Sequence, residues 1–391
     1  MNYILFDGTS RSNLLPFTFT RPVADIRVGI LTIREKWETF LDTTTSTRTE
    51  GYLSKKYPMV ELEHNVMINS SYLPTPQLVK QIIELKENQA IFYKEEVIAF
   101  FSKDSQDNID FETYEVIECV QDVMKIEHTW DIFAKNGEAI KADFEMLTKG
   151  KTSQPIPKSN QVLGAEHIFI EEGASIECTI LNATTGPIYI GKDAEVMEGS
   201  VIRGPFALGE HATVKMGAKI YGPTTVGPHS KVGGEINNSV IFGYSNKGHD
   251  GFLGNSVIGE WCNLGADTNN SNLKNNYAEV RLWDYKTEGF AKTGLQFCGL
   301  MMGDHSKCGI NTMFNTGTVV GVSANIFGSG FPRNFVPSFS WGGSSGFTTY
   351  LTHKAFEVAE VVMKRRDIVC TEEDKKILEF VFEDSKKWRK G

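Results

Sequence analysis

A six-residue period of aliphatic side chains runs through the middle of the chain and constrains its fold more than any other feature. Aliphatic residues recur at every sixth position from Ile190 to Val232, and most are followed within two places by a glycine or another small residue. An α-helix requires apolar residues three and four positions apart, and a half-buried strand alternates every second residue. A period of six fits neither. It fits a chain that makes a short strand, turns and repeats, stacking parallel coils with one aliphatic residue per hexad facing inward.

The same frame continues after a slip of two residues, with inward positions at Val240, Asn246, Phe252, Ile258, Leu264, Met302, Cys308, Phe314, Val320 and Ile326. In this frame Asn246 stands where an aliphatic residue is expected. Residues 270–297 contain no hexads, and long loops without secondary structure are commonly functional. The pattern resembles the left-handed parallel β-helix of hexapeptide-repeat acyltransferases, and the left hand is implied by that resemblance alone.

Composition narrows the class of function. The 391 residues are too many for one ordinary core, and the net charge of −9 argues against a nucleic-acid or anionic-membrane binder. The N-terminus lacks the basic and apolar runs of a signal peptide, and no segment has the apolar length of a bilayer span. The six cysteines show no CxxC spacing, so reduced thiols are expected. These features predict a cytoplasmic protein with small-molecule substrates, no nucleic-acid partner and no membrane partner.

The stretch GHDGFLGNSVIGEWCNLGADTNNSN falls where the repeat is interrupted. It resembles, without a gap, the acetyltransferase motif of the bifunctional N-acetylglucosamine-1-phosphate uridyltransferases (GlmU), which runs approximately GHxxYxGDxxIGxxVNxGAGTxTxN. The resemblance implies that His249 is the general base and that Asn263 and Asn272 hold the amino sugar. It also implies that the backbone at Gly265 and Ala266 faces acetyl-CoA, the expected cosubstrate.

A histidine suits this chemistry, because transfer of an acetyl group from a thioester to glucosamine-1-phosphate requires a base for the amine proton. An imidazole, whose ordinary pKa is about 6.5, accepts that proton near neutral pH. Backbone amides at tight turns can stabilise the thioester oxyanion. Among the eight histidines only His249 has this context. His211 and His229 are expected to be solvated turn residues, and His305 a structural one.

Two positions depart from the motif. Phe252 stands where the family usually has tyrosine, and Asp267 replaces the second glycine of GAG. Each change is compatible with an altered acceptor preference or with weakened activity. Phe252 and Lys247 complete the predicted substrate-binding set.

Coenzyme A is expected, by resemblance, along the outer groove of the later coils. The candidates for its phosphates and pantetheine arm are Lys292, Asn311 and Arg333. A surface role for Arg333 remains an alternative.

Residues 1–158 contain no hexads. The strand YILFDG and the helix PQLVKQIIELKE predict a small α/β domain. The segment DGTSRSNLLPFTFTRPVADIRVG resembles, in degraded form, the GxGTRxxPLTxxxPKxL opening of sugar-phosphate nucleotidyltransferases. The resemblance makes Gly8, Thr9 and Arg11 nucleotide-binding candidates, and Arg21 or Arg27 could carry the charge of the missing lysine.

Nucleotidyl transfer requires Mg²⁺, usually held by an aspartate after a strand. The best equivalent segment, VMINSSYLP, has no carboxylate, and the metal ligands stay unassigned, with Asp7 and Asp25 as possible substitutes. The sequence leaves two alternatives for this domain: an active transferase, or an old nucleotide-binding domain retained as a platform.

The predicted architecture is an α/β nucleotidyltransferase-like domain (1–158), a left-handed parallel β-helix (159–345) and a C-terminal helical cap (346–391). The predicted activity is acetyl-CoA-dependent N-acetylation of glucosamine-1-phosphate, coupled to uridylyl transfer from UTP, in a homotrimer. Two alternatives remain: a sugar-1-phosphate nucleotidyltransferase whose β-helix only oligomerises, and a non-catalytic scaffold.

Overall fold

The computed structural model describes residues 1–102 and 110–389, which form two compact units. The first comprises Met1–Leu14, Thr20–Ile26 and Leu31–His128. The second comprises the short segments Leu15–Phe19 and Arg27–Ile30 together with the chain from Thr129 onward. Residues 129–158, which the sequence analysis assigns to the N-terminal domain, are therefore grouped with the β-helix.

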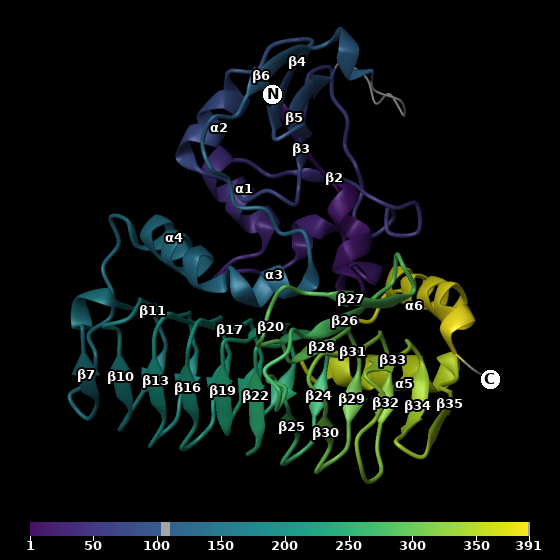
Figure 1. The fold of residues 1–391 in the computed structure, drawn as a ribbon. Helices are drawn as coiled ribbons and strands as arrows, with labels where there is room; N and C mark the ends of the chain where they lie inside the picture. Colours follow the sequence, from purple (N-terminus) through teal and green to yellow (C-terminus); the bar gives the residue numbers. More distant parts are fainter. Residues whose placement is uncertain (103–109, 390–391) are drawn as a thin grey trace. The chain divides into compact units, whose positions relative to one another are not determined.

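The first unit is built on a six-stranded mixed sheet with the order β2-β1-β3-β5-β4-β6 (Figure 1). Its strands are β1 (Asn2–Phe6), β2 (Ser46–Arg48), β3 (Asn65–Asn69), β4 (Gln89–Tyr93), β5 (Glu96–Ser102) and β6 (Glu115–Glu118). Its α-helices are α1 (Ile33–Leu41) and α2 (Pro76–Ile83), each with a threonine side chain capping its first turn. The predicted strand YILFDG and helix PQLVKQIIELKE are confirmed as β1 and α2.

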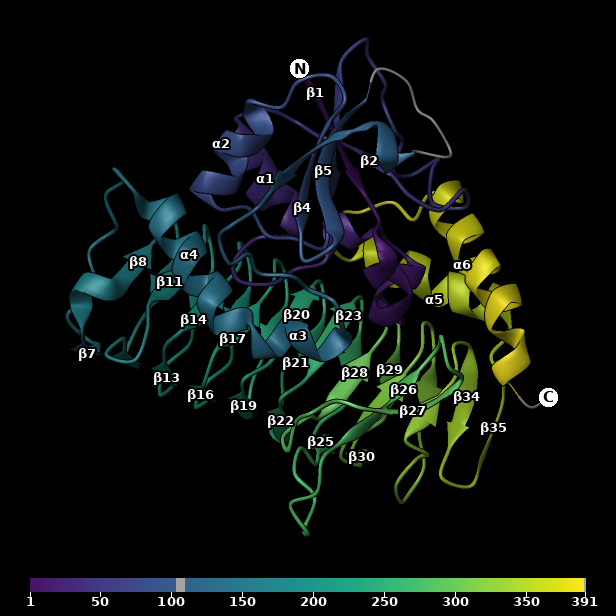
Figure 2. The same ribbon diagram turned by 45° about the horizontal axis from the view of Figure 1, so that its top comes forward.

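The second unit is a parallel β-helix whose coils present three sheets (Figures 1 and 2). The first face contains β7 (Gln161–Leu163), β10 (Ile180–Asn182), β13 (Val201–Arg203), β16 (Lys219–Tyr221), β19 (Glu235–Asn237) and β22 (Phe252–Gly254). The second contains β8 (Ile168–Ile170), β11 (Ile188–Ile190), β14 (Phe206–Leu208), β17 (Thr224–Val226), β20 (Val240–Gly243), β23 (Val257–Glu260), β28 (Leu300–Met302), β31 (Thr318–Val320) and β33 (Phe335–Val336). The third contains β9 (Ser175–Ile176), β12 (Glu195–Val196), β15 (Thr213–Val214), β18 (Lys231–Val232), β21 (Asn246–Lys247), β24 (Asn263–Leu264), β29 (Lys307–Cys308), β32 (Asn325–Ile326), β34 (Ser340–Gly343) and β35 (Gly346–Thr349).

The hexad prediction is confirmed from Ile190 to Val232, where all eight positions lie in one buried core. Later positions Ile258, Leu264, Met302, Cys308, Phe314, Val320 and Ile326 lie in the same core. The parallel β-helix is thereby confirmed, and its handedness stays a prediction from the resemblance.

Three predicted inward positions are wrong because one coil is shorter than the frame assumed. Leu208 pairs with Val226, eighteen positions further on, whereas Val226 pairs with Ile241, only fifteen positions further on. Ile241 and Leu253 therefore enter the core in place of Val240 and Phe252. By the same shift Lys247, and not Asn246, pairs with the inward Val232.

The interruption at residues 270–297 is not a structureless loop. It contains the antiparallel hairpin of β26 (Arg281–Asp284) and β27 (Gly289–Lys292). The Trp283 ring stacks on Phe335, with 4.1 Å between ring centroids, so the hairpin packs on the β-helix. At its start, β25 (Asn269–Asn270) pairs with β30 (Met313–Phe314) of the next coil.

Helices precede and follow the β-helix in the chain. Before it come α3 (Thr129–Ala134) and α4 (Asn136–Thr148), which contact β23 and β17 of the second face. The predicted tail forms α5 (Thr352–Lys364) and α6 (Glu372–Asp384), and Thr371 caps α6 with a capping box to Asp374. The last two residues of the predicted cap, 390–391, lie outside the described residues. No helix within residues 1–102 and 110–389 has the length and apolarity needed to cross a bilayer.

Candidate functional site

The outward residues of the third face form the floor of a cavity. In each strand of this face the residue before the inward position faces out, and in consecutive coils these residues are Lys231, Asn246, Asn263 and Lys307. A glycine follows the inward residue in each of these coils, at Gly233, Gly248, Gly265 and Gly309. Because glycine has no side chain, this column of glycines leaves room above the strands.

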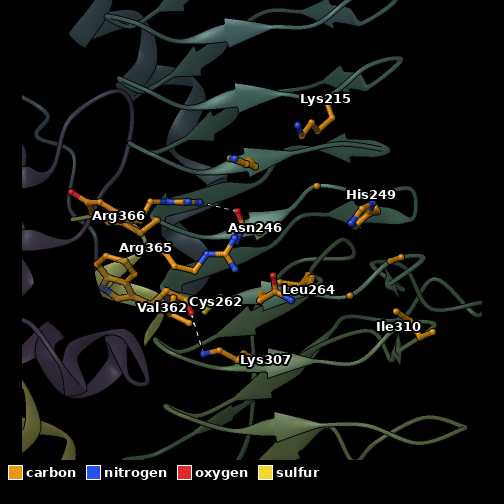
Figure 3. Close-up of a pocket in the computed structure, with 17 residues that line it drawn as sticks. Lys215, Asn246, His249, Cys262, Leu264, Lys307, Ile310, Val362, Arg365 and Arg366 are labelled. Atoms are coloured by element: carbon orange, nitrogen blue, oxygen red, sulfur yellow. Dashed lines mark hydrogen bonds between the residues drawn. The ribbon is translucent and has the colours of Figure 1, made fainter. Parts of the chain in front are cut away.

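The cavity has a volume of about 620 Å³ and extends from the end of α5 to the turn that carries His249 (Figure 3). Arg365 and Arg366 extend over the strands from one side, whereas His249 lies on the turn at the other end (Figure 3). Arg366 donates a hydrogen bond of 3.4 Å to the amide oxygen of Asn246. The site therefore combines residues of five successive coils with residues at the end of α5.

Cations dominate the lining. Five basic side chains contribute to it, namely Lys215, Lys231, Lys307, Arg365 and Arg366, and no carboxylate is among its described lining residues. Burial lowers the pKa of Lys231, and the neighbouring Arg366 and Lys215 lower it further. Burial likewise lowers the pKa of Lys307. Mutual repulsion of this kind disfavours the empty site and favours an anionic ligand. On a chain of net charge −9, such a concentration of positive charge indicates a phosphate-bearing ligand.

His249 is exposed on the four-residue turn between β21 and β22. No side chain among the described residues hydrogen-bonds to its imidazole, so both ring nitrogens are available. The turn itself is fixed on both sides, because the Asp250 carbonyl accepts from the Asp267 amide at 3.0 Å and the Gly251 carbonyl from the Glu235 amide at 3.1 Å. An imidazole with both nitrogens available is thus presented on a hydrogen-bonded turn at the edge of a cationic cavity.

Asn263, Gly265 and Ala266, all predicted site residues, line the cavity together with His249. The Gly265 amide donates a hydrogen bond of 3.1 Å to the Cys308 carbonyl. The Ala266 amide donates to no carbonyl or side chain among the residues that the structure describes. It is therefore free to stabilise negative charge on a ligand oxygen.

Two of the remaining predicted acceptor-binding residues, Phe252 and Asn272, lie outside the cavity. Phe252 begins β22 on the first face, and Asn272 donates a 2.8 Å hydrogen bond to the Asn255 side chain. Neither lines the cavity. The structure does not bring them together with Asn263, which leaves their binding role a prediction.

Lys247 is placed inside the β-helix, with only 2% of its surface exposed. Its ammonium donates to the carbonyls of Gly233, His249 and Asp250 at 3.2, 2.6 and 3.1 Å. All three N–H donors are thereby used. This inward orientation of Lys247 contradicts its predicted contact with substrate. The shorter coil places Asn246 outward and Lys247 inward.

The predicted coenzyme A residues are dispersed. Lys292 lies on the β26–β27 hairpin, 3.8 Å from a Glu279 carboxylate oxygen, and Arg333 is exposed near the last coils. Asn311 is exposed beside the cavity, and its backbone amide donates to the Ala266 carbonyl at 2.8 Å. None of the three lines the cavity, although Ile310 next to Asn311 does.

Five rings stack along the corner between the second and third faces: His211, His229, Tyr244, Trp261 and His305. Neighbouring centroids are 4.3 to 6.3 Å apart, and all five residues have left-handed backbone with φ between 53° and 61°. Tyr244 and Trp261 form a wall of the cavity. The predicted turn positions of His211, His229 and His305 are confirmed. Their rings are part of this stack of five.

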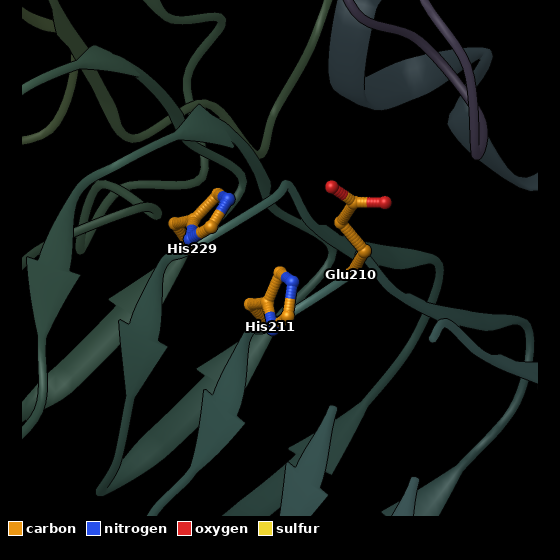
Figure 4. Close-up of side chains that lie close together, drawn as sticks. All are labelled: Glu210, His211 and His229. Atoms are coloured by element: carbon orange, nitrogen blue, oxygen red, sulfur yellow. The ribbon is translucent and has the colours of Figure 1, made fainter. Parts of the chain in front are cut away.

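Glu210, His211 and His229 offer ligand atoms within 4.8 Å of one another and could hold a metal ion (Figure 4). Burial lowers the pKa of His229, and the charges of His211 and Arg366 contribute to this lowering. The positive charge of Arg366 also disfavours a metal cation at this position. A structural role for the stacked rings therefore fits these three residues better than a metal centre.

In the first unit, Gly8 and Thr9 lie beside the end of β3. A Cβ on Gly8 would come within 2.7 Å of the Asn69 side chain, so this close approach requires glycine. Glu96, which the sequence analysis did not identify, accepts from Thr9 at 3.4 Å and from Lys125 at 2.7 Å. Burial opposes ionisation of Glu96, but the hydrogen bonds of Lys125 and Tyr72 outweigh it and lower its pKa.

The predicted cationic residues of this unit are engaged by the protein itself. Arg11 forms a 3.0 Å ion pair with Asp7 and a 2.8 Å hydrogen bond to Tyr52, and Arg21 is buried. Arg27 belongs to the second unit, where it donates to the carbonyls of Phe242 and Ile30 at 2.9 and 2.6 Å.

The possible Mg²⁺ ligands do not fit that role. Asp7 is ion-paired with Arg11 and accepts from the Val23 amide, and Asp25 is held by Arg34 at 2.8 Å. Glu96 is occupied by Lys125. These three carboxylates therefore have protein partners where a metal ion would have to bind.

Gly248 allows the shape of the cavity to be tested. A Cβ placed there meets no atom within 4 Å, whereas one on Gly265 would lie 2.5 Å from backbone. We expect Gly248→Ala to keep the thermal unfolding midpoint within about 2 °C of the parent, since surface changes cost under about 0.5 kcal/mol. It should weaken ligand binding in calorimetry, because the methyl group enters the cavity. Gly289→Ala, on β27 outside the cavity, is the control, because its Cβ meets only the Thr287 carbonyl oxygen at an ordinary 3.8 Å. Equal affinities for both variants would contradict the assignment.

The N-terminal part of the chain matches a family of known proteins. Residues 3–152 match the family described as sugar nucleotidyl transferase. The chain is 35% identical over 144 residues to a bifunctional sugar-1-phosphate nucleotidylyltransferase/acetyltransferase of Sulfurisphaera tokodaii, covering 36% of this chain and 35% of that protein. It is 33% identical over 89 residues to the bifunctional protein GlmU of Methanocaldococcus jannaschii, covering 22% of this chain and 21% of that one. The matches thus span about a third or less of these relatives.

Among solved structures, an Arabidopsis UDP-N-acetylglucosamine acyltransferase shares 16% identity at a TM-score of 0.26, over 55% of this chain and 80% of that one. The polySia-specific acetyltransferase NeuO shares 16% identity at a TM-score of 0.28, over 54% of this chain and all of that one.

Proposed function

We propose that this chain, which resembles GlmU-like bifunctional proteins, is a transferase that N-acetylates an amino sugar 1-phosphate in its β-helix, with acetyl-CoA as donor. The observation that carries the proposal is the shared cavity of His249, Asn263 and Ala266 with five basic side chains. A base, an amide group and anion-binding charge are what an amine nucleophile bearing a phosphate requires.

In the proposed reaction the acceptor amine attacks the thioester carbonyl and loses its proton to His249. The free Ala266 amide stabilises the carbonyl oxygen as it becomes an oxyanion. The C–N bond forms, the C–S bond breaks, and the proton passes from the imidazole to the departing thiolate of coenzyme A. No covalent enzyme intermediate is required.

We further propose that glucosamine-1-phosphate is the acceptor and that the first unit transfers a uridylyl group from UTP to the product, giving UDP-N-acetylglucosamine for the cell envelope. The likeness of residues 3–152 to sugar nucleotidyl transferases supports the second step. The engaged carboxylates Asp7, Asp25 and Glu96 favour the alternative of a nucleotide-binding platform. A cytoplasmic homotrimer is part of the same proposal, and sedimentation equilibrium tests the trimer.

The test reads the two products separately. Purified protein with acetyl-CoA and glucosamine-1-phosphate should release free thiol only when both are present, and pyrophosphate should appear only after UTP and Mg²⁺ are added. Pyrophosphate without thiol release would support a nucleotidyltransferase with a β-helix scaffold. Neither product would support a non-catalytic protein.

The cations allow the phosphate to be located. Replacing Lys231 with methionine or Arg366 with glutamine removes a charge-assisted contact, so KM for the sugar phosphate should rise about 10- to 100-fold (~1.5–3 kcal/mol). KM for unphosphorylated glucosamine should change little. Lys192→Met, an exposed lysine outside the cavity, is the matched control. An equal rise for both acceptors would contradict phosphate binding by these residues.

A further inference from the structure

Lys247 occupies a position that its neighbours in the stack give to apolar residues. It lies in the inward column between Val232 of one coil and Leu264 of the next, and it is almost fully buried. Burying an ammonium group among aliphatic side chains is costly unless each of its donors finds an acceptor. A lysine there needs a reason other than packing.

The reason lies in the backbone of the His249 turn. Lys247 Nζ donates to the carbonyl oxygens of His249 at 2.6 Å and Asp250 at 3.1 Å, and to Gly233 of the preceding coil at 3.2 Å. The carbonyls of His249 and Asp250 are therefore turned toward the ammonium group of Lys247. Lys247 is the hydrogen-bond donor that the structure shows for the His249 carbonyl.

We propose that Lys247 is the positioning residue of the acetyl-transfer site, holding the His249 turn from inside the β-helix. The inference rests on the proposed function, since it assigns a role in that reaction. Lys247 never touches substrate: it fixes the main chain of His249 and joins it to the preceding coil through Gly233. Because the His249 imidazole has no side-chain partner among the described residues, the direction in which it points depends on this main-chain restraint.

The restraint depends on the charge of the amine. A protonated lysine has three N–H donors for three carbonyls, whereas the neutral amine has two. Burial lowers the pKa of Lys247 to about 8, and the carboxylates of Asp250 and Asp267 oppose that shift, as does Cys308. Since the folded pKa lies below that of the unfolded chain, the lysine loses its proton in the native state as pH rises through about 8. The His249 turn should loosen over that range, even though the free energy of unfolding that Lys247 contributes rises there.

The experiment compares Lys247→Met, which keeps length and removes all donors, with Lys247→Gln, which keeps two. For Lys247→Met we expect kcat for acetyl transfer to fall about tenfold, with KM for acetyl-CoA unchanged within about twofold. The wild-type kcat should fall as pH rises above 8, where Lys247 loses its proton, and this fall should be absent from both variants. Lys247→Gln should retain an intermediate kcat. Ile326→Met, in the same inward column three coils further on, is the control for repacking.

Amide hydrogen exchange gives a readout that does not depend on turnover. The Asp267 and Glu235 amides, which donate to the Asp250 and Gly251 carbonyls, should exchange faster in Lys247→Met, while β12 and β15 keep their protection. If the variant does not fold, the wild type supplies the test, because exchange at these two amides should accelerate between pH 7 and pH 9 beyond the intrinsic base-catalysed increase. Unchanged relative protection there overturns the proposal.

The two hypotheses fail differently. If His249→Ala abolishes acetyl transfer while Lys247→Met keeps the wild-type kcat, pH profile and exchange, the positioning role is overturned and the proposed function stands. If the wild type releases no thiol in the presence of acceptor, the proposed function is lost. Exchange at the Asp267 and Glu235 amides then still shows whether Lys247 restrains the turn.

Discussion

Replacing His249 with alanine should lower kcat for acetyl transfer by about 10²- to 10⁴-fold, the usual contribution of a positioned general base. His249 is exposed at the edge of the cavity, and no other histidine lines it. Without the imidazole the amine must lose its proton to water. KM for both substrates should change little, because the five cations and Asn263 remain. Steady-state thiol release at saturating acetyl-CoA measures the effect.

The matched control is His167→Ala, an exposed histidine outside the cavity that lies 3.7 Å from Glu166. Nucleotidyl transfer by the His249→Ala protein should equal that of the parent, which excludes a folding defect. Added imidazole should restore part of the rate, since the truncated side chain leaves an open site for it. Full activity of His249→Ala without imidazole would remove the base from the mechanism and favour a scaffold role for the β-helix.

Truncating Phe314 to alanine should reduce the free energy of unfolding by about 3–5 kcal/mol. Phe314 is 1% exposed in the β-helix core, on the strand that rejoins the coils after the hairpin insertion. Its partner across the ladder is Asn270, whose amide is already engaged with Gly254, at 2.8 Å as acceptor and 3.0 Å as donor. Met313, the other residue of that strand, is 38% exposed and outside the core, so a cavity should remain where the ring is removed.

Urea unfolding followed by circular dichroism measures this loss. Phe331→Ala is the comparison, because Phe331 is 50% exposed and its truncation should cost under about 0.5 kcal/mol. Equal midpoints for the two variants would mean that the coils after the insertion do not fold cooperatively with those before it.

Much of the fold could be predicted because every regular coil repeats the same inward spacing. The frame failed at Val240, Asn246 and Phe252, where apolar residues stand side by side in the pairs Val240–Ile241 and Phe252–Leu253. Local sequence cannot decide which member of such a pair faces inward. The register of the neighbouring coil decides it.

Part of the site could be predicted for a similar reason. His249, Asn263, Gly265 and Ala266 belong to one contiguous motif. The basic residues are brought together only by the stacking of the coils. Lys231 and Lys307 each directly precede an inward residue, so their outward positions could have been predicted from the hexad frame. The positions of Arg365 and Arg366 could not have been predicted, because they depend on how α5 packs.

The coils that precede β15 contribute no side chain to the cavity, whose earliest lining residue is Lys215. In a stack where each layer contacts only its neighbours, stability is a sum over layers. Gene segments that encode whole layers at that end can therefore be duplicated or lost during evolution while the chemistry stays intact. Relatives of very different length can share one active site, and chain length is then a poor guide to which of them catalyse the same reaction.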